Sequence, residues 1–277
     1  MPELPEVETI RRQILPLVRE HTILSARVTR ARAVRAHRSA EEFTQLAAGH
    51  RILDVRRRGK ALLMLLENDS AVLIRLGMSG RVNVVSAEAP LAPHTHVVLT
   101  LSNGSELRFI DPRTFGQMAV VVGHDPDRMV ELGHYGVEPL DDAFTPEVLQ
   151  RLLAGKHMLI EAALMDQTKI AGIGKIYADE ACFLAGISPL RKAGSLHAGE
   201  VQRLHAAIRT VLEQSIDARG TSSADAAYRD ADGNKGGFQQ QLHVYQRENQ
   251  PCRVCGTLIE HRPFQGRRMH FCPHCQQ

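Results

Sequence analysis

The sequence lacks any long uncharged apolar segment. No stretch approaches the roughly 18 apolar residues that suffice to cross a bilayer, so we expect no membrane span and no membrane partner. The N-terminus also lacks the basic and then apolar leader of an exported protein, and carries acids and prolines instead. We therefore expect a cytoplasmic protein.

A strong excess of one charge is absent too, because 34 basic residues against 31 acidic ones leave a net charge of +3. The overall charge thus indicates a polyanionic partner only weakly. The basic residues are unevenly spread, however, in two clusters: Arg51, Arg56, Arg57, Arg58 and Lys60, then Arg262, Arg267 and Arg268. Two separated clusters fit a groove that follows phosphates, although solvated faces of an unrelated enzyme would look similar.

Cysteine is scarce, and four of the five cysteines fall within the last 26 residues. Two further residues separate the members of each pair, Cys252 with Cys255 and Cys272 with Cys275. This spacing is typical of a zinc site, in which two knuckles supply four thiolates to one Zn²⁺. Two disulfides are the alternative, which a reducing cytosol disfavours. Because four thiolates close the coordination shell, the metal would be structural. Cys182 lies in an apolar segment, and we expect it to be buried.

The 277 residues are enough for two domains, and no internal repeat is visible. The first part, residues 23 to 122, is predicted to be mainly β structure. Asn103-Gly104 is a strong hairpin signal between two of the strands. Many short strands with tight connections favour antiparallel sheets packed as a sandwich. The expected strands are 52–55, 61–66, 71–76, 96–101, 106–110 and 118–122.

Helices are predicted from about residue 145 onward. The first begins at Thr145-Pro146-Glu147 and ends before Gly155, and the second covers about 157 to 166. The third follows a glycine turn and ends near Gly186, and the fourth has apolar residues from Val201 to Ile216 on one face. Two helices joined by a glycine turn fit a helix-turn-helix unit, a weak signal by itself. Residues 220–240 read equally well as a lid or a linker, and 242–245 as a strand entering the cysteine module.

The N-terminal residues can carry chemistry. Removal of Met1 would expose the amine of Pro2, and an α-amino group with a pKa near 7.8 is partly neutral at physiological pH. Such an amine is a ready nucleophile for a carbon electrophile, with Glu3 and Glu6 beside it. The same residues also make a good helix start, with Pro5 in the first turn and acids near the positive end of the dipole.

Several motifs in order make the chain resemble the formamidopyrimidine-DNA glycosylase family, the Fpg branch of the Fpg/Nei base-excision enzymes. The resemblance runs essentially end to end, and leucine at position 4 favours the Fpg branch. The motifs are 1–9 (MPELPEVET), 58–60 (RGK), 76–80 (LGMSG), 111–116 (DPRTFG), 171–180 (AGIGKIYADE), Tyr245, and 251–256 (PCRVCG) ahead of the second cysteine pair.

The resemblance implies an α+β multidomain fold with double-stranded DNA between its domains. Residues 1–135 would form the catalytic domain, an antiparallel β-sandwich with a leading helix. Residues 136–238 would form the helix-two-turn-helix domain with a lesion-capping loop. Residues 239–277 would form a zinc-finger β-hairpin holding one structural Zn²⁺. The oligomeric state expected from the resemblance is a monomer.

The resemblance also assigns roles to residues. Pro2 would attack the sugar C1′, Glu3 would protonate the ring oxygen, and Glu6 would support the site. Lys60 would contact the phosphate beside the lesion, with His94 as a helper. Three further residues would fill the void left by the flipped nucleotide, and a finger arginine would grip the flanking phosphates. The void-filling residues would be Met78, Arg113 and Phe115, and the finger arginine would be Arg267. Without the resemblance, Met78 and Phe115 would be taken for core residues.

The sequence departs from the family at two positions. Lys175 stands where the family usually has an asparagine that contacts the lesion phosphate, and Glu161 stands where it commonly has a lysine linked with oxidised purines. The two changes are opposite in charge. We therefore expect Glu161 and Lys175 to face each other and partly compensate. Compensation requires the side chains to lie within about 8 Å, the Debye length at physiological salt.

The resulting hypothesis is a bifunctional DNA glycosylase and apurinic/apyrimidinic lyase of base excision repair. It would excise 8-oxoguanine and formamidopyrimidines through a Schiff base on the N-terminal proline, followed by β,δ-elimination. Its partner would be double-stranded DNA with oxidised bases or abasic sites. The alternative is a damaged-DNA-binding homologue whose lesion specificity Glu161 and Lys175 weaken or alter. A zinc-ribbon transcription factor would leave the N-terminal motifs unexplained.

Overall fold

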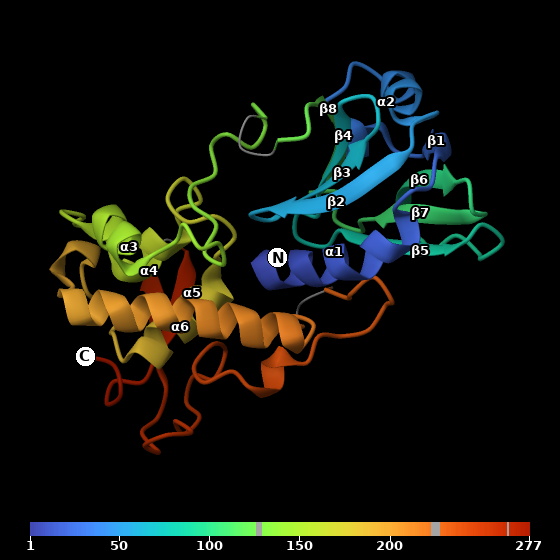
Figure 1. Cartoon of the computed structure of the whole chain (residues 1–277). Coiled ribbons are helices and arrows are strands. Elements are labelled where there is room, and N and C mark those ends of the chain that lie inside the picture. Colours follow the sequence, from blue (N-terminus) through green and yellow to red (C-terminus); the bar gives the residue numbers. More distant parts are fainter. Residues whose placement is uncertain (126–128, 223–227, 265) are drawn as a thin grey trace. The chain divides into compact units, whose positions relative to one another are not determined.

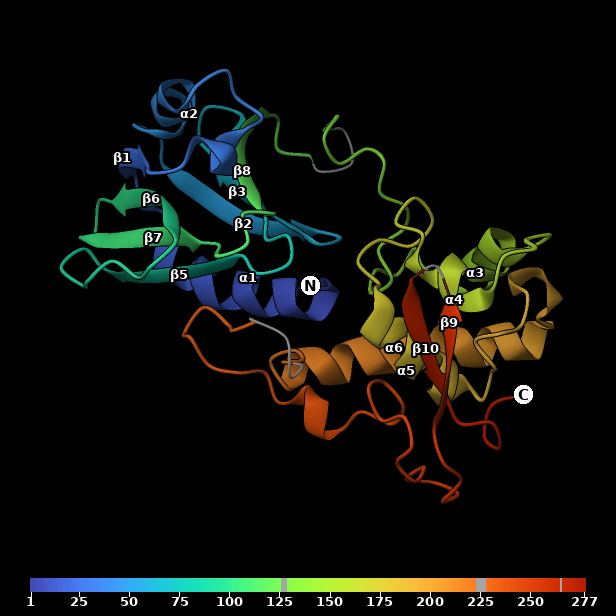
Figure 2. The same cartoon turned by 180° about the vertical axis from the view of Figure 1, so that it is seen from behind.

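The computed structural model describes residues 1–125, 129–222, 228–264 and 266–277. The chain divides into two compact units (Figures 1 and 2). Unit 1 comprises Met1–His134 together with Ala218–Gly237, and unit 2 comprises Tyr135–Asp217 together with Phe238–Gln277. Residues 218–237, which the sequence places in the helical domain, thus return to unit 1.

Unit 1 begins with helix α1 (Leu4–Val18), whose N-cap is Glu3 and whose first turn contains a proline. The apolar face of the helix is buried up to Ile14 as its spacing predicts, but Leu17 is 42% exposed. Val18 is buried in its place. With 3.6 residues per turn, the residue four positions after Ile14 continues this face.

Two antiparallel four-stranded sheets form the body of unit 1, as predicted for a sandwich. Their strand orders are β1-β6-β7-β5 and β2-β3-β4-β8, and apolar residues of both sheets share one core. Helix α1 contacts β2 and β3 of one sheet and β5 of the other (Figure 1). The strands are β1 (Ile23–Val28), β2 (Ile52–Arg58), β3 (Ala61–Leu66), β4 (Ser70–Arg75), β5 (Arg81–Ser86), β6 (Thr95–Leu101), β7 (Ser105–Ile110) and β8 (Gln117–Val122).

A short helix lies within the region predicted as mainly β. Helix α2 (Ala40–Ala47) follows a 3₁₀ turn, η1 (Ala31–Val34), and its N-cap Ser39 accepts a hydrogen bond from the Glu42 backbone. Phe43 and Ala47, four positions apart, are its buried residues. A face of only two residues is too short to show helical periodicity in the sequence.

Unit 2 is built from four α-helices among its described residues, close to the predicted ranges. The second helix is shorter than predicted, and the third ends at Gly186 in the left-handed conformation. Cys182 in this third helix is buried as expected, which raises the pKa of its thiol. The elements are α3 (Pro146–Leu153), α4 (Ile160–Met165), α5 (Lys175–Ala185), α6 (Ala198–Asp217), and the short 3₁₀ turns η2 (Ala193–Ser195) and η3 (Phe238–Gln240).

The C-terminal part of unit 2 is a two-stranded antiparallel hairpin, β9 (Glu260–Phe264) and β10 (Arg267–Phe271). Strand β10 contacts α5, beside which it is drawn in Figure 2. The strand predicted at 242–245 does not form. The backbone N–H groups of His243, Val244 and Tyr245 instead donate to the carboxylate of Glu180 on α5 at 2.8–2.9 Å. In the part of the chain that the structure describes, no helix is long and apolar enough to cross a membrane.

Candidate active site and metal centre

Glu6 organises the N-terminal residues. Its carboxylate is almost completely buried, and Oε2 accepts a hydrogen bond of 2.8 Å from the backbone of Glu3. Its other oxygen, Oε1, accepts one of 2.7 Å from the backbone of Thr221. Pro2, which precedes Glu3 in the sequence, is also buried. One side chain thus ties the start of the chain to a segment more than 200 residues away.

Gly220 permits this contact. Its φ of +82° is in the left-handed region, and a Cβ there would lie 2.9 Å from Glu6 Oε1. Only glycine satisfies both conditions without displacing the carboxylate. The residues that follow are also anchored, because Tyr228 is buried in the core of unit 1 and its hydroxyl donates to the Arg219 carbonyl at 3.1 Å.

A central part of the predicted lid or linker, residues 230–232, is fastened to α1. Gln13 donates to the carboxylates of Asp230 and Asp232, at 3.0 and 2.9 Å, and accepts from the backbone of Ala231. Residues 223–227 of this segment lie outside the described residues. The sequence of 220–240 thus includes stretches that are packed on the leading helix.

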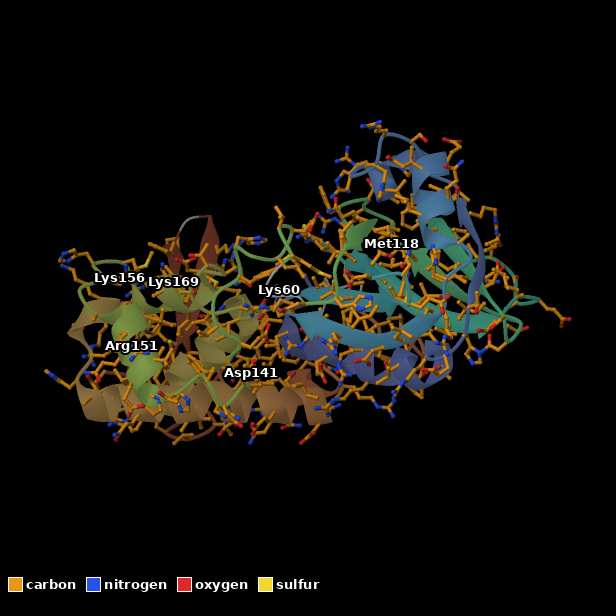
Figure 3. All side chains as sticks on the ribbon, turned by 45° about the horizontal axis from the view of Figure 1, so that its top comes forward. Lys60, Met118, Asp141, Arg151, Lys156 and Lys169 are labelled. Carbon is orange, nitrogen blue, oxygen red and sulfur yellow. The ribbon has the colours of Figure 1, made fainter. Side chains whose placement is uncertain are left out.

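Lys60 lies in the turn between β2 and β3, directly after Gly59, whose φ is +54°. Figures 1 and 3 both place this turn beside the start of α1. An ion pair of 3.3 Å between Glu8 of α1 and Arg57 of β2 holds this end of the strand against the helix. Burial would raise the pKa of Glu8, but hydrogen bonds and charges from neighbouring arginines outweigh burial and lower it. Glu8 therefore stays ionised.

Buried Asp111 shapes the loop that follows β7. Its Oδ1 accepts a hydrogen bond of 2.5 Å from Ser79, and its Oδ2 accepts one of 2.7 Å from the backbone of Gly116. The carbonyl of His94, an exposed residue with φ +64°, accepts from the Asp111 backbone at 3.0 Å. Three loops of unit 1 are thus fixed around one residue, Asp111, through its carboxylate and its backbone.

These loops present the three residues expected to fill a void. Met78 is 41% exposed and Phe115 is 49% exposed. The Arg113 guanidinium lies 5.4 Å from the centre of the Phe115 ring. Neither Met78 nor Phe115 is a core residue, so an assignment from their apolar character alone would have been wrong. Large apolar side chains held at the surface by a rigid loop are suited to contact a partner.

Glu161 and Lys175 face each other as the opposite departures predict. Lys175 Nζ lies 2.9 Å from Glu161 Oε1 and also contacts Asp179 Oδ2. Asp179 in turn accepts hydrogen bonds from the backbone and Nδ1 of His270 on β10, at 3.2 and 3.0 Å. The distance is well inside the 8 Å limit, so the two side chains form a buried ion pair and the expected proximity is confirmed.

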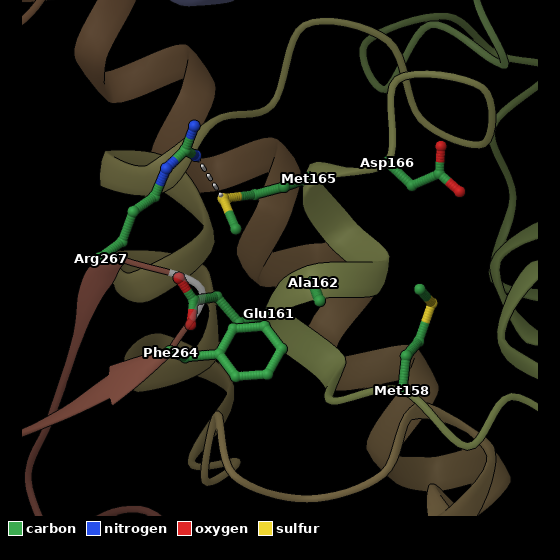
Figure 4. A pocket seen from close by; sticks show the side chains of 7 residues that line it. All are labelled: Met158, Glu161, Ala162, Met165, Asp166, Phe264 and Arg267. Atoms are coloured by element: carbon green, nitrogen blue, oxygen red, sulfur yellow. Dashed lines mark hydrogen bonds between the residues drawn. The ribbon is translucent and has the colours of Figure 1, made fainter.

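Arg267, the expected finger arginine, is the exposed first residue of β10. Its Nη1 lies 3.8 Å from the sulfur of Met165 (Figure 4). Both line a pocket of about 300 Å³ between α4 and the hairpin. The other lining residues are Met158, Glu161, Ala162, Asp166 and Phe264.

The four predicted cysteine ligands converge, with all four Sγ atoms within 4.8 Å of one another. The separations of 3.5 Å (Cys255 to Cys272) and 3.9 Å (Cys252 to Cys275) are too long for disulfides. They match the roughly 3.8 Å between two sulfurs that are each 2.3 Å from a tetrahedral metal. Hydrogen bonds from Thr257 lower the pKa of Cys255, whereas burial raises the pKa values of Cys272 and Cys275, so the geometry carries the assignment. The site therefore fits a tetrahedral metal ion.

The sequence did not reveal the carboxylates that support the site. Asp111, Asp179 and Glu180 lie inside the quoted motifs, yet their roles depend on partners at least 32 residues away along the chain. Acidic residues within an apolar segment, such as Asp179 and Glu180 in α5, are the available signal. A buried acid requires hydrogen-bonding partners, but a sequence does not show which ones.

Comparison with known proteins agrees with this geometry. The family model of the formamidopyrimidine-DNA glycosylase N-terminal domain matches residues 1–118, and that of the formamidopyrimidine-DNA glycosylase H2TH domain matches 135–226. The chain is 43% identical over 277 residues to the formamidopyrimidine-DNA glycosylase of Geobacillus kaustophilus, covering 100% of both. The chain belongs to the formamidopyrimidine-DNA glycosylase family. It is thus an enzyme, a DNA glycosylase and DNA lyase of base excision repair.

Solved structures of the family resemble this one over nearly the whole chain. The MutM (Fpg) protein of Thermus thermophilus gives a TM-score of 0.88 at 41% identity, covering 99% of this chain and 98% of that one. Lactococcus lactis Fpg in a complex with DNA containing an abasic site gives 0.87 at 29% identity, covering 99% of each chain. Another Lactococcus lactis complex holds a Fapy-dG-containing DNA.

Proposed function

We propose that the enzyme excises oxidised purines, 8-oxoguanine and formamidopyrimidines, from double-stranded DNA, with the amine of Pro2 as nucleophile. The observation that carries this proposal is the position of Glu6, which holds Glu3 and Thr221 from opposite oxygens. A nucleophile at a chain end would otherwise be the least ordered part of the unit. Here the neighbouring backbone is fixed by two short hydrogen bonds to a buried carboxylate.

The proposed reaction begins when Met1 is removed and the damaged nucleotide is flipped out of the duplex. The Pro2 nitrogen forms a bond to C1′, and Glu3 donates a proton to the ring oxygen as the C1′–O4′ bond breaks. The bond from C1′ to the base then breaks, and the base leaves with its electron pair and takes up a proton. The Pro2 nitrogen loses the proton that it carried as a secondary amine, and the lone pair freed in this way completes an iminium ion between the proline and C1′ as the base departs.

Strand cleavage follows from the charge of the iminium. The cation acidifies the protons on C2′, so removal of one of them expels the 3′ phosphate by β-elimination. A second elimination expels the 5′ phosphate and leaves a gap. In each step the electron pair left by the lost proton passes through an enamine on the proline nitrogen and leaves with the phosphate, so neither step needs an oxidant or a reductant. Water finally releases the sugar fragment and restores the amine.

The proposed DNA contacts come from both units. Lys60, with His94 of the same unit as a helper, would bind the phosphate beside the lesion. Phe115 would insert as a wedge and Arg113 would face the orphaned base, with Met78 filling the remaining space. Lys175 and Arg267 of unit 2 would bind phosphates. The exposure of the wedge residues and of Arg267 supports the roles of these residues.

We further propose that the four cysteines hold one Zn²⁺, which would supply a fixed tetrahedral centre and no reaction step. Backbone N–H groups donate to the cysteine sulfurs of both knuckles, from Val254 to Cys252 and from Cys275 to Cys272, each at 3.4 Å. Such bonds stabilise thiolates and orient them. Zinc would thus hold the hairpin that carries Arg267.

Borohydride trapping tests the mechanism. The enzyme is incubated with an 8-oxoguanine:C duplex and borohydride, which reduces the iminium to a stable covalent adduct. We expect an adduct with the processed protein, and none with Pro2→Gly or with protein that retains Met1. No adduct with either this duplex or an abasic-site duplex would refute the proposal.

The second candidate is a damaged-DNA-binding homologue with weak or altered specificity, and one observation favours it. Lys175 is engaged by two buried carboxylates, Glu161 and Asp179, so its charge is largely neutralised before DNA arrives. Lesion-duplex binding without an adduct would support this candidate. An adduct with the abasic-site duplex, but little with the 8-oxoguanine duplex, would show that the protein is an active lyase with an altered choice of lesion.

A further inference from the structure

Glu161 occupies an unusual place for an acid in a DNA-binding unit. Its side chain is 1% exposed and its partner Lys175 is 12% exposed, so the pair is almost fully removed from water. Lys175 is the first residue of α5, where the positive end of the helix dipole also favours an anion. The carboxylate of Glu161 therefore pairs with Lys175, the cation that would bind a DNA phosphate in the proposed function.

We propose that Glu161 is an internal competitor of DNA, whose carboxylate holds Lys175 in the free protein and must release it when a DNA phosphate binds at the start of α5. This inference rests on the proposed function, because it requires that Lys175 meets a phosphate. It makes Glu161 a residue that sets DNA affinity without touching DNA.

The charges of the cluster support competition. Two buried carboxylates, Glu161 and Asp179, share one ammonium group, so the three charges add up to −1. Asp179 keeps other partners, since His270 donates to it twice. Each acid has one oxygen that lacks a hydrogen-bond partner within the described residues, Glu161 Oε2 and Asp179 Oδ1, but the bonds from His270 go to Asp179. Of the two acids on Lys175, Glu161 is therefore the one that is easier to release.

A proton can accompany the release. Burial, and then the charge of Asp179, raise the pKa of Glu161 to about 7, despite the opposing charge of Lys175. The groups that face it are Lys175 and Asp179 on α5, His270 and Arg267 on β10, and Asp166 after α4. A phosphate on Lys175 adds one more negative charge, which favours the neutral acid further.

The structure also provides space for the released side chain. Glu161 lines the pocket of about 300 Å³ beside α4, together with Met158, Met165 and Phe264 (Figure 4). These apolar neighbours suit a neutral carboxylic acid better than a carboxylate. Rotation into this pocket would part Glu161 from Lys175 without moving α4.

The test measures binding of a fluorescein-labelled duplex that carries a tetrahydrofuran abasic analogue, by anisotropy over a salt series at pH 8. We expect Glu161→Gln to bind about three- to tenfold more tightly than the wild type. We also expect the slope of log Kd against log salt to steepen by up to about one, for one additional phosphate neutralised. The gain should vanish in Glu161→Gln/Lys175→Met. Weaker or unchanged binding by Glu161→Gln, or a gain that survives without Lys175, would overturn the proposal.

Glu260→Gln is the matched control. Glu260 lies on β9 of the same unit and pairs with Arg262 at the surface, at 3.1 Å. The control removes the same charge, so an equal gain in affinity would mean a general electrostatic effect and would also overturn the proposal. Circular dichroism checks that each variant is folded.

A measurement on the wild type alone tests the proposal even if the Glu161→Gln variant does not fold. Calorimetry in two buffers of different ionisation enthalpy should show uptake of about half a proton on binding at pH 7, since a group with a pKa near 7 is half protonated there. No uptake would contradict the competition. If the wild type forms a borohydride adduct but Glu161→Gln binds unchanged, only this inference fails; if the wild type neither binds nor forms an adduct, the proposed function fails.

Discussion

At the scale of single residues, the active-site region depends on atoms that do no chemistry. Glu6 bonds to Glu3 and Thr221, and this geometry requires that Gly220 has no side chain. A methyl group at position 220 would compete with Glu6 Oε1 for the same space. The proposed proline nucleophile is therefore supported by a glycine distant in sequence.

Gly220→Ala should reduce adduct formation strongly and lower the free energy of unfolding by more than the roughly 1–2 kcal/mol of a left-handed alanine. The extra cost comes from displacement of Glu6. Gly233→Ala is the control, because Gly233 has a similar φ of +87° but no heavy atom within 4 Å of the position that a Cβ would take. Trapping yield and urea unfolding measure the two effects. Equal behaviour of the two variants would show that the contact with Glu6 is unimportant.

At the scale of elements, local patterns predicted most helices and strands. The cysteine spacing, the Asn103-Gly104 hairpin and the proline at the start of α3 each depend on neighbouring residues. The error at 242–245 has the opposite origin. Those backbone N–H groups bond to Glu180, more than 60 residues earlier, so no local pattern distinguishes them from a strand. The Glu161–Lys175 pair was predictable because its two departures are opposite in charge.

Removal of the metal should affect the finger and leave the sandwich intact. A strong chelator, or Cys272→Ser, removes the centre that holds the hairpin with Arg267, so we expect DNA binding to fall at least about tenfold. Unit 1 has its own core, and its thermal unfolding should change little. Zinc added back after chelation should restore binding. Full binding by the metal-free protein would contradict the proposed role of the site.

At the scale of the whole molecule, stability should depend on pH in a way that Glu161 sets. Its pKa is raised from 4.5 to about 7 in the folded protein. The stability linked to its proton is thus fully present below pH 4.5 and is lost as the pH rises through 7, by at most about 3 kcal/mol. Urea unfolding should show wild type falling relative to Glu161→Gln over this window. A constant difference between the two would contradict the raised pKa.

Glu200 provides a control of opposite sign. The hydrogen bond from Arg191 lowers its pKa to about 2, so its contribution is present above pH 4.5 and is lost as the pH falls toward 2. Wild type should therefore lose stability relative to Glu200→Gln as the pH falls, whereas it loses stability relative to Glu161→Gln as the pH rises. The two variants together distinguish Glu161, whose ionised form burial destabilises, from Glu200, whose ionised form Arg191 stabilises.

The carboxylate of Glu180 has a consequence for how the finger is assembled. It captures three successive amides just before the first cysteine pair, so the chain enters the finger in a direction set by α5 and independent of the metal. The four thiols then have a shorter conformational search before a metal arrives. Metal uptake should accordingly be fast and reversible in the folded protein, with α5 serving as a template.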